Sequence, residues 1–98
     1  MNYRDVLVAD QRLIVLQALE EDPAYSHNEA VLRSVLGTFG HHLSRDALRT
    51  ELAWLQEQGL ITVSDAGGIQ VAKLTARGED VAKGSARVPG VARPRLEG

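Results

Sequence analysis

The first part of the chain alternates apolar and polar residues with the period of an α-helix. From Tyr3 to Glu21, apolar side chains recur at three- and four-residue intervals, with charged and amide side chains between them. The Asp22-Pro23 pair ends this pattern, because proline cannot continue a helix. The sequence therefore predicts an amphipathic helix over residues 3–21.

A second helix is predicted from Ser26 to about Leu36. Ser26 and Glu29 have the capping-box spacing, in which the serine hydroxyl accepts a free backbone N–H and the glutamate reaches back to the serine. Gly37 follows as a residue suited to a left-handed C-terminal cap. The expected buried face consists of Val31, Leu32, Val35 and Leu36.

A third helix is predicted between Ser44, a favourable N-cap residue, and Gly59. Its apolar seam comprises Leu48, Leu52 and Leu55, widened by Ala47 and Trp54. We expect Trp54 to pack in the core, as we do for Tyr25 and Phe39. The opposite face is polar with small residues and suited to lie against another surface: Arg45, Asp46, Arg49, Thr50, Ala53 and Gln56.

The pattern changes from helical to extended after the third helix. Residues 60–63 are rich in β-forming side chains, residues 69–72 alternate, and residues 65–68, Asp-Ala-Gly-Gly, have the composition of a turn. These features predict a two-stranded hairpin. Thr75 is then the candidate cap of a short fourth helix, whose length Gly78 and Gly84 limit.

The predicted fold class is mainly α with a small β-hairpin, in one domain over residues 1–83. Residues 84–98 contain three glycines and two prolines with little apolar pattern, so we expect a tail that is extended or disordered. Residues 83–98 carry a charge of +3, whereas residues 1–31 carry −4 and the whole chain −2. An overall acidic balance by itself argues against a nucleic-acid binder.

Composition excludes several classes of site. The chain has no cysteine, which rules out disulfides, thiolate nucleophiles and cysteine-based metal centres. A chain of 98 residues buries roughly 60 to 65% of its unfolded surface, too little for a core plus an enclosed substrate cavity, so we expect no enzyme. No apolar stretch approaches the roughly 20 residues of a membrane span, and no signal sequence is evident. We therefore expect a cytoplasmic protein without a membrane partner.

The order of three helices and a hairpin is that of a winged helix-turn-helix. Residues 43–61, with Leu55-x-x-x-Gly59-Leu60-Ile61 at their end, resemble the recognition helix and the start of the next strand in winged-helix repressors. Leu74-Thr75-x-x-Gly78 resembles the end of their wing. The resemblance covers about residues 8–83 and implies a three-helix core, a two-stranded wing and a short fourth helix.

Within this superfamily the chain is similar to the small proteins of Mu-like phages and prophages known as ArsR-like regulators. Residues 88–94, Val-Pro-Gly-Val-Ala-Arg-Pro, are similar to the closing segment of that group. The resemblance implies double-stranded DNA as the partner and a role in phage or prophage transcriptional regulation. Metal sensing does not carry over, because the chain lacks cysteine, and no cofactor is expected.

The candidate DNA contacts lie on the third helix and the hairpin. A recognition helix reads the major groove with side chains of its N-terminal turns. Two arginines four residues apart would reach a guanine edge or a phosphate, hydroxyls beside them a phosphate, and hairpin side chains an adjacent groove or the backbone. The candidates are Ser44, Arg45, Arg49, Thr50, Gln70, Lys73 and Arg77.

Alternatives remain open for these residues. Arg45 and Arg49 could instead pair with Asp46 and Glu51 or simply solvate the helix, and Asp46 is best explained by a favourable interaction with the helix dipole. Three histidines, His27, His41 and His42, lack a metal-ligand spacing, and the adjacent pair is expected on a turn surface or at a helix start.

Two functions follow from the sequence. The first is a DNA-binding regulator that acts as a homodimer through its first helix, because one small recognition helix gives limited affinity. The second is a winged helix used as a protein-interaction or DNA-packaging module of a phage, which the acidic balance favours.

Overall fold

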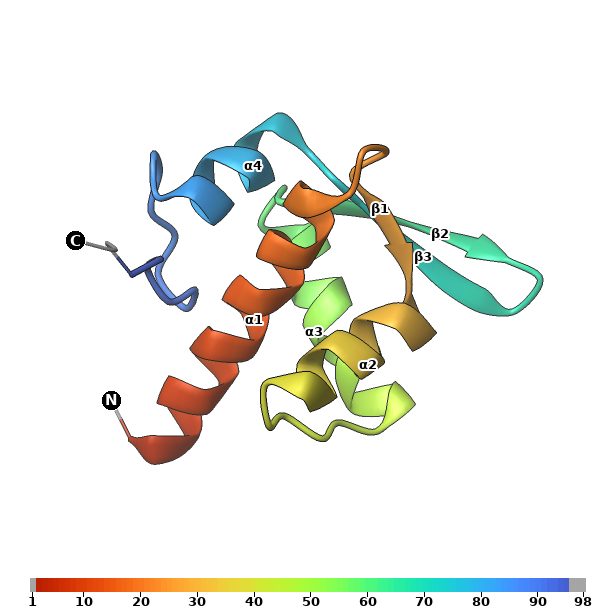
Figure 1. Ribbon diagram of the computed structural model, residues 1–98, viewed down its shortest axis with the longest axis horizontal. Coiled ribbons are helices and arrows are strands. Elements are labelled where there is room, and N and C mark those ends of the chain that lie inside the picture. Colours follow the sequence, from red (N-terminus) through yellow and green to blue (C-terminus); the bar gives the residue numbers. More distant parts are fainter. Residues whose placement is uncertain (1, 96–98) are drawn as a thin grey trace.

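Helix α1 (Tyr3–Glu21) crosses the molecule and packs against the other helices of this computed structural model, which describes residues 2–95 (Figure 1). The described part is a mixed α/β domain of four helices and a three-stranded antiparallel sheet. The remaining elements are β1 (Ser26–Asn28), α2 (Glu29–Thr38), α3 (Arg45–Glu57), β2 (Ile61–Ala66), β3 (Ile69–Leu74) and α4 (Ala76–Lys83). The strand order β1-β3-β2 places the first strand beside the last.

The bounds of α1 confirm the prediction from periodicity. The side chain of its N-cap residue, Asn2, accepts from the Asp5 backbone N–H at 2.9 Å, and the Asp5 side chain accepts from the Asn2 backbone N–H. Both of these backbone N–H groups at the helix start therefore have hydrogen-bond partners. Leu16 and Leu19 are fully buried in the core between the helices and the sheet. Asp22 ends the helix in an extended conformation, as the Asp-Pro pair predicted.

The predicted start of the second helix is wrong. Ser26 begins β1 instead of a helix, and β1 pairs antiparallel with residues 71–73 of β3. The actual N-cap is Asn28, whose side chain accepts from the Val31 N–H at 2.9 Å. Backbone pairing to β3 outweighs the capping box because it satisfies several backbone groups at once. The fold therefore has a third strand in addition to the predicted hairpin.

The end and the buried face of α2 also differ from the prediction. The helix continues through Gly37 to Thr38, and the left-handed glycine is Gly40, with φ of 85°. Leu32 and Leu36 are buried as expected, but Val31 lies on the exposed side.

Helix α3 confirms the predicted third helix. Ser44 is its N-cap and accepts from the Ala47 N–H at 3.0 Å, and the leucine seam is fully buried. Ala47 is exposed, so it does not widen the seam. Trp54 packs on the edge of the core, where the Arg12 guanidinium stacks over its ring at 3.7 Å.

Two aromatic residues expected in the core lie outside it. Tyr25 is 41% exposed and Phe39 65% exposed. Both occupy turns between elements, where the side chain follows the local backbone geometry instead of a helix face. Tyr25 adopts φ of 57° so that the chain can turn from α1 into β1.

The hairpin is longer than predicted and its turn is shorter. Strands β2 and β3 extend to Ala66 and from Ile69, so only Gly67 and Gly68 form the turn. Their φ angles of 63° and 87° are those of a two-residue turn in which both central residues lie in the left-handed region. Two consecutive glycines meet this requirement without strain.

Helix α4 begins after Thr75, as predicted, and ends at Gly84, with φ of 84°. Gly78 lies inside the helix and does not limit it. Residues 84–95, part of the segment expected to be extended or disordered, have no regular secondary structure but pack on the domain: Val88 is buried and the Ala92 N–H donates to the Ala9 carbonyl at 3.1 Å. Burial of apolar side chains holds this segment against the domain, a feature that its glycine and proline content did not suggest. The last three residues of the predicted tail lie outside the described part.

Candidate nucleic-acid interface

A charged cluster joins α2, α3 and the hairpin at the N-terminal side of α3. Arg49 donates to both carboxylate oxygens of Glu29, from Nε to Oε1 at 2.8 Å and from Nη2 to Oε2 at 2.7 Å. Arg49 Nη2 also donates to the Gly68 carbonyl at 2.9 Å, and the Gln70 N–H donates to Glu29 Oε2 at 2.6 Å. Three elements therefore meet at one ion pair.

The electrostatics of this cluster keep both partners charged. Glu29 is only 3% exposed, and its pKa is lowered from 4.5 to about 2, chiefly by the hydrogen bond from Arg49 and then by the Gln70 N–H, against the opposing effect of burial. The same hydrogen bond raises the pKa of Arg49 above its ordinary value. The carboxylate accepts three hydrogen bonds in all, which explains why it is stable inside the fold.

Arg45 projects from the first turn of α3 and is exposed. It forms no salt bridge with any residue between 2 and 95, although its positive charge lowers the pKa of Glu29 slightly. Its neighbour Asp46 is exposed as well and lies where an acid stabilises a helix N-terminus. The alternative pairing of the two helix arginines with Asp46 and Glu51 is wrong for Arg49, because Glu51 instead pairs with Arg12 at 2.7 Å.

The two hydroxyls predicted to contact phosphate differ in their hydrogen bonds. Ser44 Oγ accepts from a backbone N–H, so its own proton remains available to a further acceptor. Thr50 Oγ1 donates its proton to the Asp46 carbonyl at 3.1 Å. Ser44 can therefore donate to a phosphate without losing an existing bond, whereas Thr50 has to rotate first.

The remaining candidates do not all lie at this site. On β3, Gln70 shares its face with the buried Ala72 and Leu74, whereas Lys73, three residues after Gln70, lies on the opposite face. Arg77 donates to the Gln58 carbonyl at 3.2 Å, at the C-terminal end of α3, roughly 20 Å along the helix axis from Arg45.

The structure thus brings together most of the predicted contacts and separates two of them. The group at the N-terminal side of α3 and the hairpin is Ser44, Arg45, Arg49, Thr50 and Gln70. Lys73 and Arg77 lie apart from it. Glu29 was interpreted as a capping residue, and no local signal pairs it with an arginine on a different helix.

One of the three histidines, His41, holds two elements together. His41 is 9% exposed; its Nε2 donates to Asp10 Oδ2 at 2.8 Å, and its Nδ1 accepts from the Gln11 amide at 3.3 Å. This pair ties the connection between α2 and α3 to α1, so the predicted surface position is wrong for His41. It is correct for His42, which is exposed. No three His, Cys, Asp or Glu side chains within residues 2–95 form a group that could hold a metal ion.

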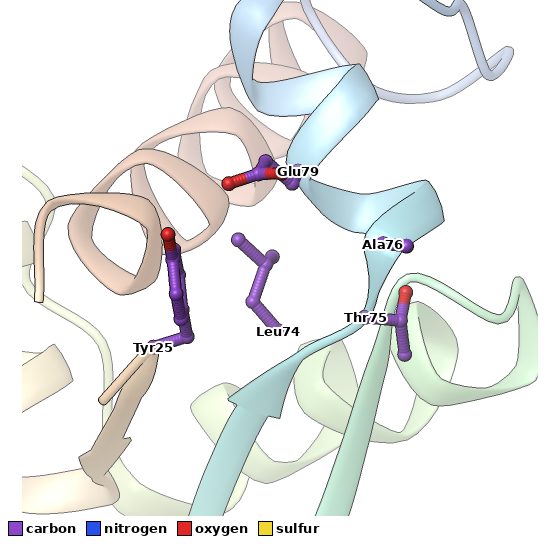
Figure 2. A pocket seen from close by; sticks show the side chains of 5 residues that line it. All are labelled: Tyr25, Leu74, Thr75, Ala76 and Glu79. Carbon is purple, nitrogen blue, oxygen red and sulfur yellow. The ribbon is translucent and has the colours of Figure 1, made fainter. Parts of the chain in front are cut away.

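A shallow pocket of about 190 Å³ lies beside the start of α4 (Figure 2). Figure 2 shows the Leu74 side chain between the Tyr25 ring and the Glu79 carboxylate. The Leu74 N–H donates to the Tyr25 carbonyl at 2.8 Å, which fixes this turn against the sheet. Its lining carries one carboxylate, that of Glu79, and the hydroxyl groups of Tyr25 and Thr75.

The geometry defines a small α/β domain with a helix and a hairpin coupled at one face. No helix in the described range has the length and apolar character needed to cross a membrane. Over 91 residues, which are 93% of this chain and 94% of the relative, the sequence is 47% identical to the uncharacterized protein gp26 of Escherichia phage Mu. The chain therefore belongs to the family of phage Mu gp26.

A second relative supports the same family. The chain is 42% identical over 78 residues, 79% of its length and 76% of the relative, to an uncharacterized protein of Haemophilus influenzae (strain ATCC 51907 / DSM 11121 / KW20 / Rd). No protein-family model matches the chain, and no solved structure matches it.

Proposed function

We propose that this protein is a winged-helix DNA-binding protein that acts as a phage or prophage transcriptional regulator and reads the major groove with α3. The element order supports this, because two helices joined by a short connection precede a hairpin that pairs with an earlier strand. The observation that carries the proposal is the coupling of α3 and the hairpin at one face by Arg49 and Glu29. Two elements held together can contact one duplex in a defined register.

This face presents an exposed cation despite the overall net charge of −2 and the exposed acids Asp46 and Asp65. Glu29 is buried and neutralised by Arg49, and Asp65 accepts from the Gly68 N–H at 2.7 Å at the hairpin turn. Arg45 is then the exposed cation at the start of α3, beside the Ser44 hydroxyl. We assign Arg45 to a guanine edge or a phosphate and Ser44 to a phosphate.

The matched test compares Arg45→Ala with Arg87→Ala. Both residues are exposed arginines, and Arg87 lies beyond α4, so the two variants change net charge equally. Fluorescence anisotropy on duplex DNA should show a loss of about tenfold or more for Arg45→Ala and little change for Arg87→Ala. Equal binding by both variants and the parent would show that α3 does not read DNA.

The partner in solution is proposed to be a second copy, through α1. A groove of about 830 Å³ follows this helix, with Val6 (51% exposed) and Phe39 (65% exposed) in its lining. Arg93 and Arg95 line the same groove, whereas α1 itself carries a net charge of −2. In a two-fold pair, the acidic α1 of each copy would meet the arginines of the other.

Light scattering after size-exclusion chromatography tests this pairing. Val6→Glu should give a monomer, and Val31→Glu on α2, which is also an exposed valine, should leave the dimer unchanged. A parent protein that is monomeric at high concentration would contradict the pairing.

The exposed α1 face also favours the second function, a protein-interaction or DNA-packaging module of a phage. Such a protein would use this face on a different phage protein. A packaging protein would bind DNA without changing transcription, so a reporter assay on a bound fragment separates it from a regulator.

A further inference from the structure

We propose that Arg49 and Glu29 are a positioning pair that fixes the hairpin against α3, and that Arg49 does not itself contact DNA. This inference rests on the proposed function only for its consequence in DNA binding. The positioning of the hairpin by Arg49 and Glu29 concerns the free protein and is argued from contacts within the chain.

The pair lies where the sheet loses its third strand. Strand β1 pairs with β3 only as far as Asn28 opposite Val71. The next residue of each chain segment, Glu29 and Gln70, continues the contact through a side chain, since the Gln70 N–H donates to the Glu29 carboxylate at 2.6 Å. The carboxylate thus replaces the backbone partner that β1 no longer provides.

The hairpin beyond this point projects away from the helices (Figure 1). A two-stranded ribbon without further support is marginally stable in water. Arg49 holds its turn through the Gly68 carbonyl at 2.9 Å, while Glu29 holds the Gln70 N–H two residues later. The ion pair connects these two attachment points, so it restrains the direction of the hairpin relative to α3.

The same geometry argues against a direct DNA contact by Arg49. Its Nε and Nη2 groups make three hydrogen bonds within the protein. A phosphate that drew Nε or Nη2 away would leave Glu29, 3% exposed, without its cation, and an unpaired buried carboxylate is strongly unfavourable; the two Nη1 donors make no hydrogen bond to the described residues. Arg45, one helical turn earlier and free of salt bridges to described residues, has no such constraint.

Amide hydrogen exchange of the free protein tests whether Arg49 and Glu29 hold the hairpin in place. In Arg49→Ala and in the conservative Glu29→Gln, the Gln70 amide should exchange at least about tenfold faster than in the parent, while the core amides of α1 remain protected. Arg49→Lys should restore part of the protection. Arg87→Ala is the charge-matched control and should leave Gln70 unchanged. If the Gln70 amide exchanged at the rate of the parent protein in both Arg49→Ala and Glu29→Gln, the proposal would be overturned.

The salt dependence of DNA binding tests the second part. A phosphate contact contributes about one unit to the slope of log affinity against log salt concentration. Arg45→Ala should lower the slope by about one, whereas Arg49→Lys should weaken binding several-fold with the parental slope. Arg49→Ala should also keep the parental slope, and a loss of about one unit of slope in this variant would identify Arg49 as a phosphate contact and overturn the proposal.

The two experiments fail separately. If the parent does not bind DNA, the proposed function is contradicted, and the exchange of Gln70 still decides whether Arg49 and Glu29 position the hairpin. If Gln70 exchange is unchanged while DNA binding is present, the positioning pair is contradicted and the proposed function stands.

Discussion

Replacing Gly78 by alanine is expected to destabilise the domain, although alanine is the better helix former. Gly78 lies inside α4, where an exposed Gly→Ala change stabilises by about 1 kcal/mol. Here, a Cβ would lie 2.0 Å from the Leu60 carbonyl oxygen and 2.7 Å from Leu74 Cδ1. The leucine methyl can rotate away, but the carbonyl is backbone and accepts from the Thr75 N–H at 3.1 Å.

The magnitude follows from the displacement that this clash requires. Helix α4 has to move by about 1 Å or more, and overpacking of this kind costs about 1 to 3 kcal/mol. Loss of the Thr75 N–H bond to Leu60 adds about 1 kcal/mol. After subtraction of the helix-propensity gain, we expect Gly78→Ala to lower the free energy of unfolding by about 2 kcal/mol.

Urea denaturation followed by circular dichroism measures this change, with Gly37→Ala as the matched control. Gly37 also lies inside a helix, but its Cβ would meet nothing closer than His42 Nδ1 at 3.7 Å. We therefore expect Gly37→Ala to stabilise the protein by about 0.5 to 1 kcal/mol. Equal or greater stability of Gly78→Ala than of the parent would refute the close approach of α4 to Leu60.

Three further predictions concern caps, core and pH. Asn28→Ala should lower the free energy of unfolding by about 1 kcal/mol, as measured by urea denaturation, because it removes the N-cap of α2, whereas Ser26→Ala should change it less. A larger loss of stability in Ser26→Ala than in Asn28→Ala would contradict Asn28 as the cap and favour the capping box of Ser26 and Glu29. Leu16→Ala should lower it by about 2 to 5 kcal/mol, and a loss below 1 kcal/mol would contradict full burial. By NMR, the Glu29 carboxyl should titrate near 2, not 4.5; since this pKa is depressed by folding, its stabilising effect is complete above about pH 4.5 and is lost as the pH falls towards 2.

Helices α1, α3 and α4 could be predicted closely because their signals are local. Periodic leucines mark the buried faces of α1 and α3, and Ser44 and Thr75 cap the helices that they were expected to cap. A cap and a helical face depend on residues within a few positions, so one sequence contains the relevant information.

Strand β1 could not be predicted in the same way. It has three residues without a β-forming pattern, and its partner Lys73 lies 47 positions after Ser26. Only the tertiary fold brings that strand edge to Ser26, and the capping box was the stronger local signal. The packing of residues 84–95 escaped prediction for a similar reason, since its few apolar residues, among them the buried Val88 and the partly buried Val91, follow no helical or strand period.

The candidate site shows the same limit. Arg45 and Arg49 were assigned one role because they share a helix face, but only Arg49 meets Glu29, twenty residues earlier in the chain. The alternation of β3 could have separated Gln70 from Lys73, because residues three apart on a strand point to opposite faces. The DNA contacts themselves stay predictions.

The most direct test of the DNA-binding assignment is a titration of the parent protein, followed by fluorescence anisotropy. Random-sequence duplexes and fragments of phage and host DNA should be compared at two salt concentrations. The account predicts binding that weakens steeply as salt rises and is tighter for a subset of fragments. Absence of binding even at low salt would contradict it and would favour the protein-interaction function.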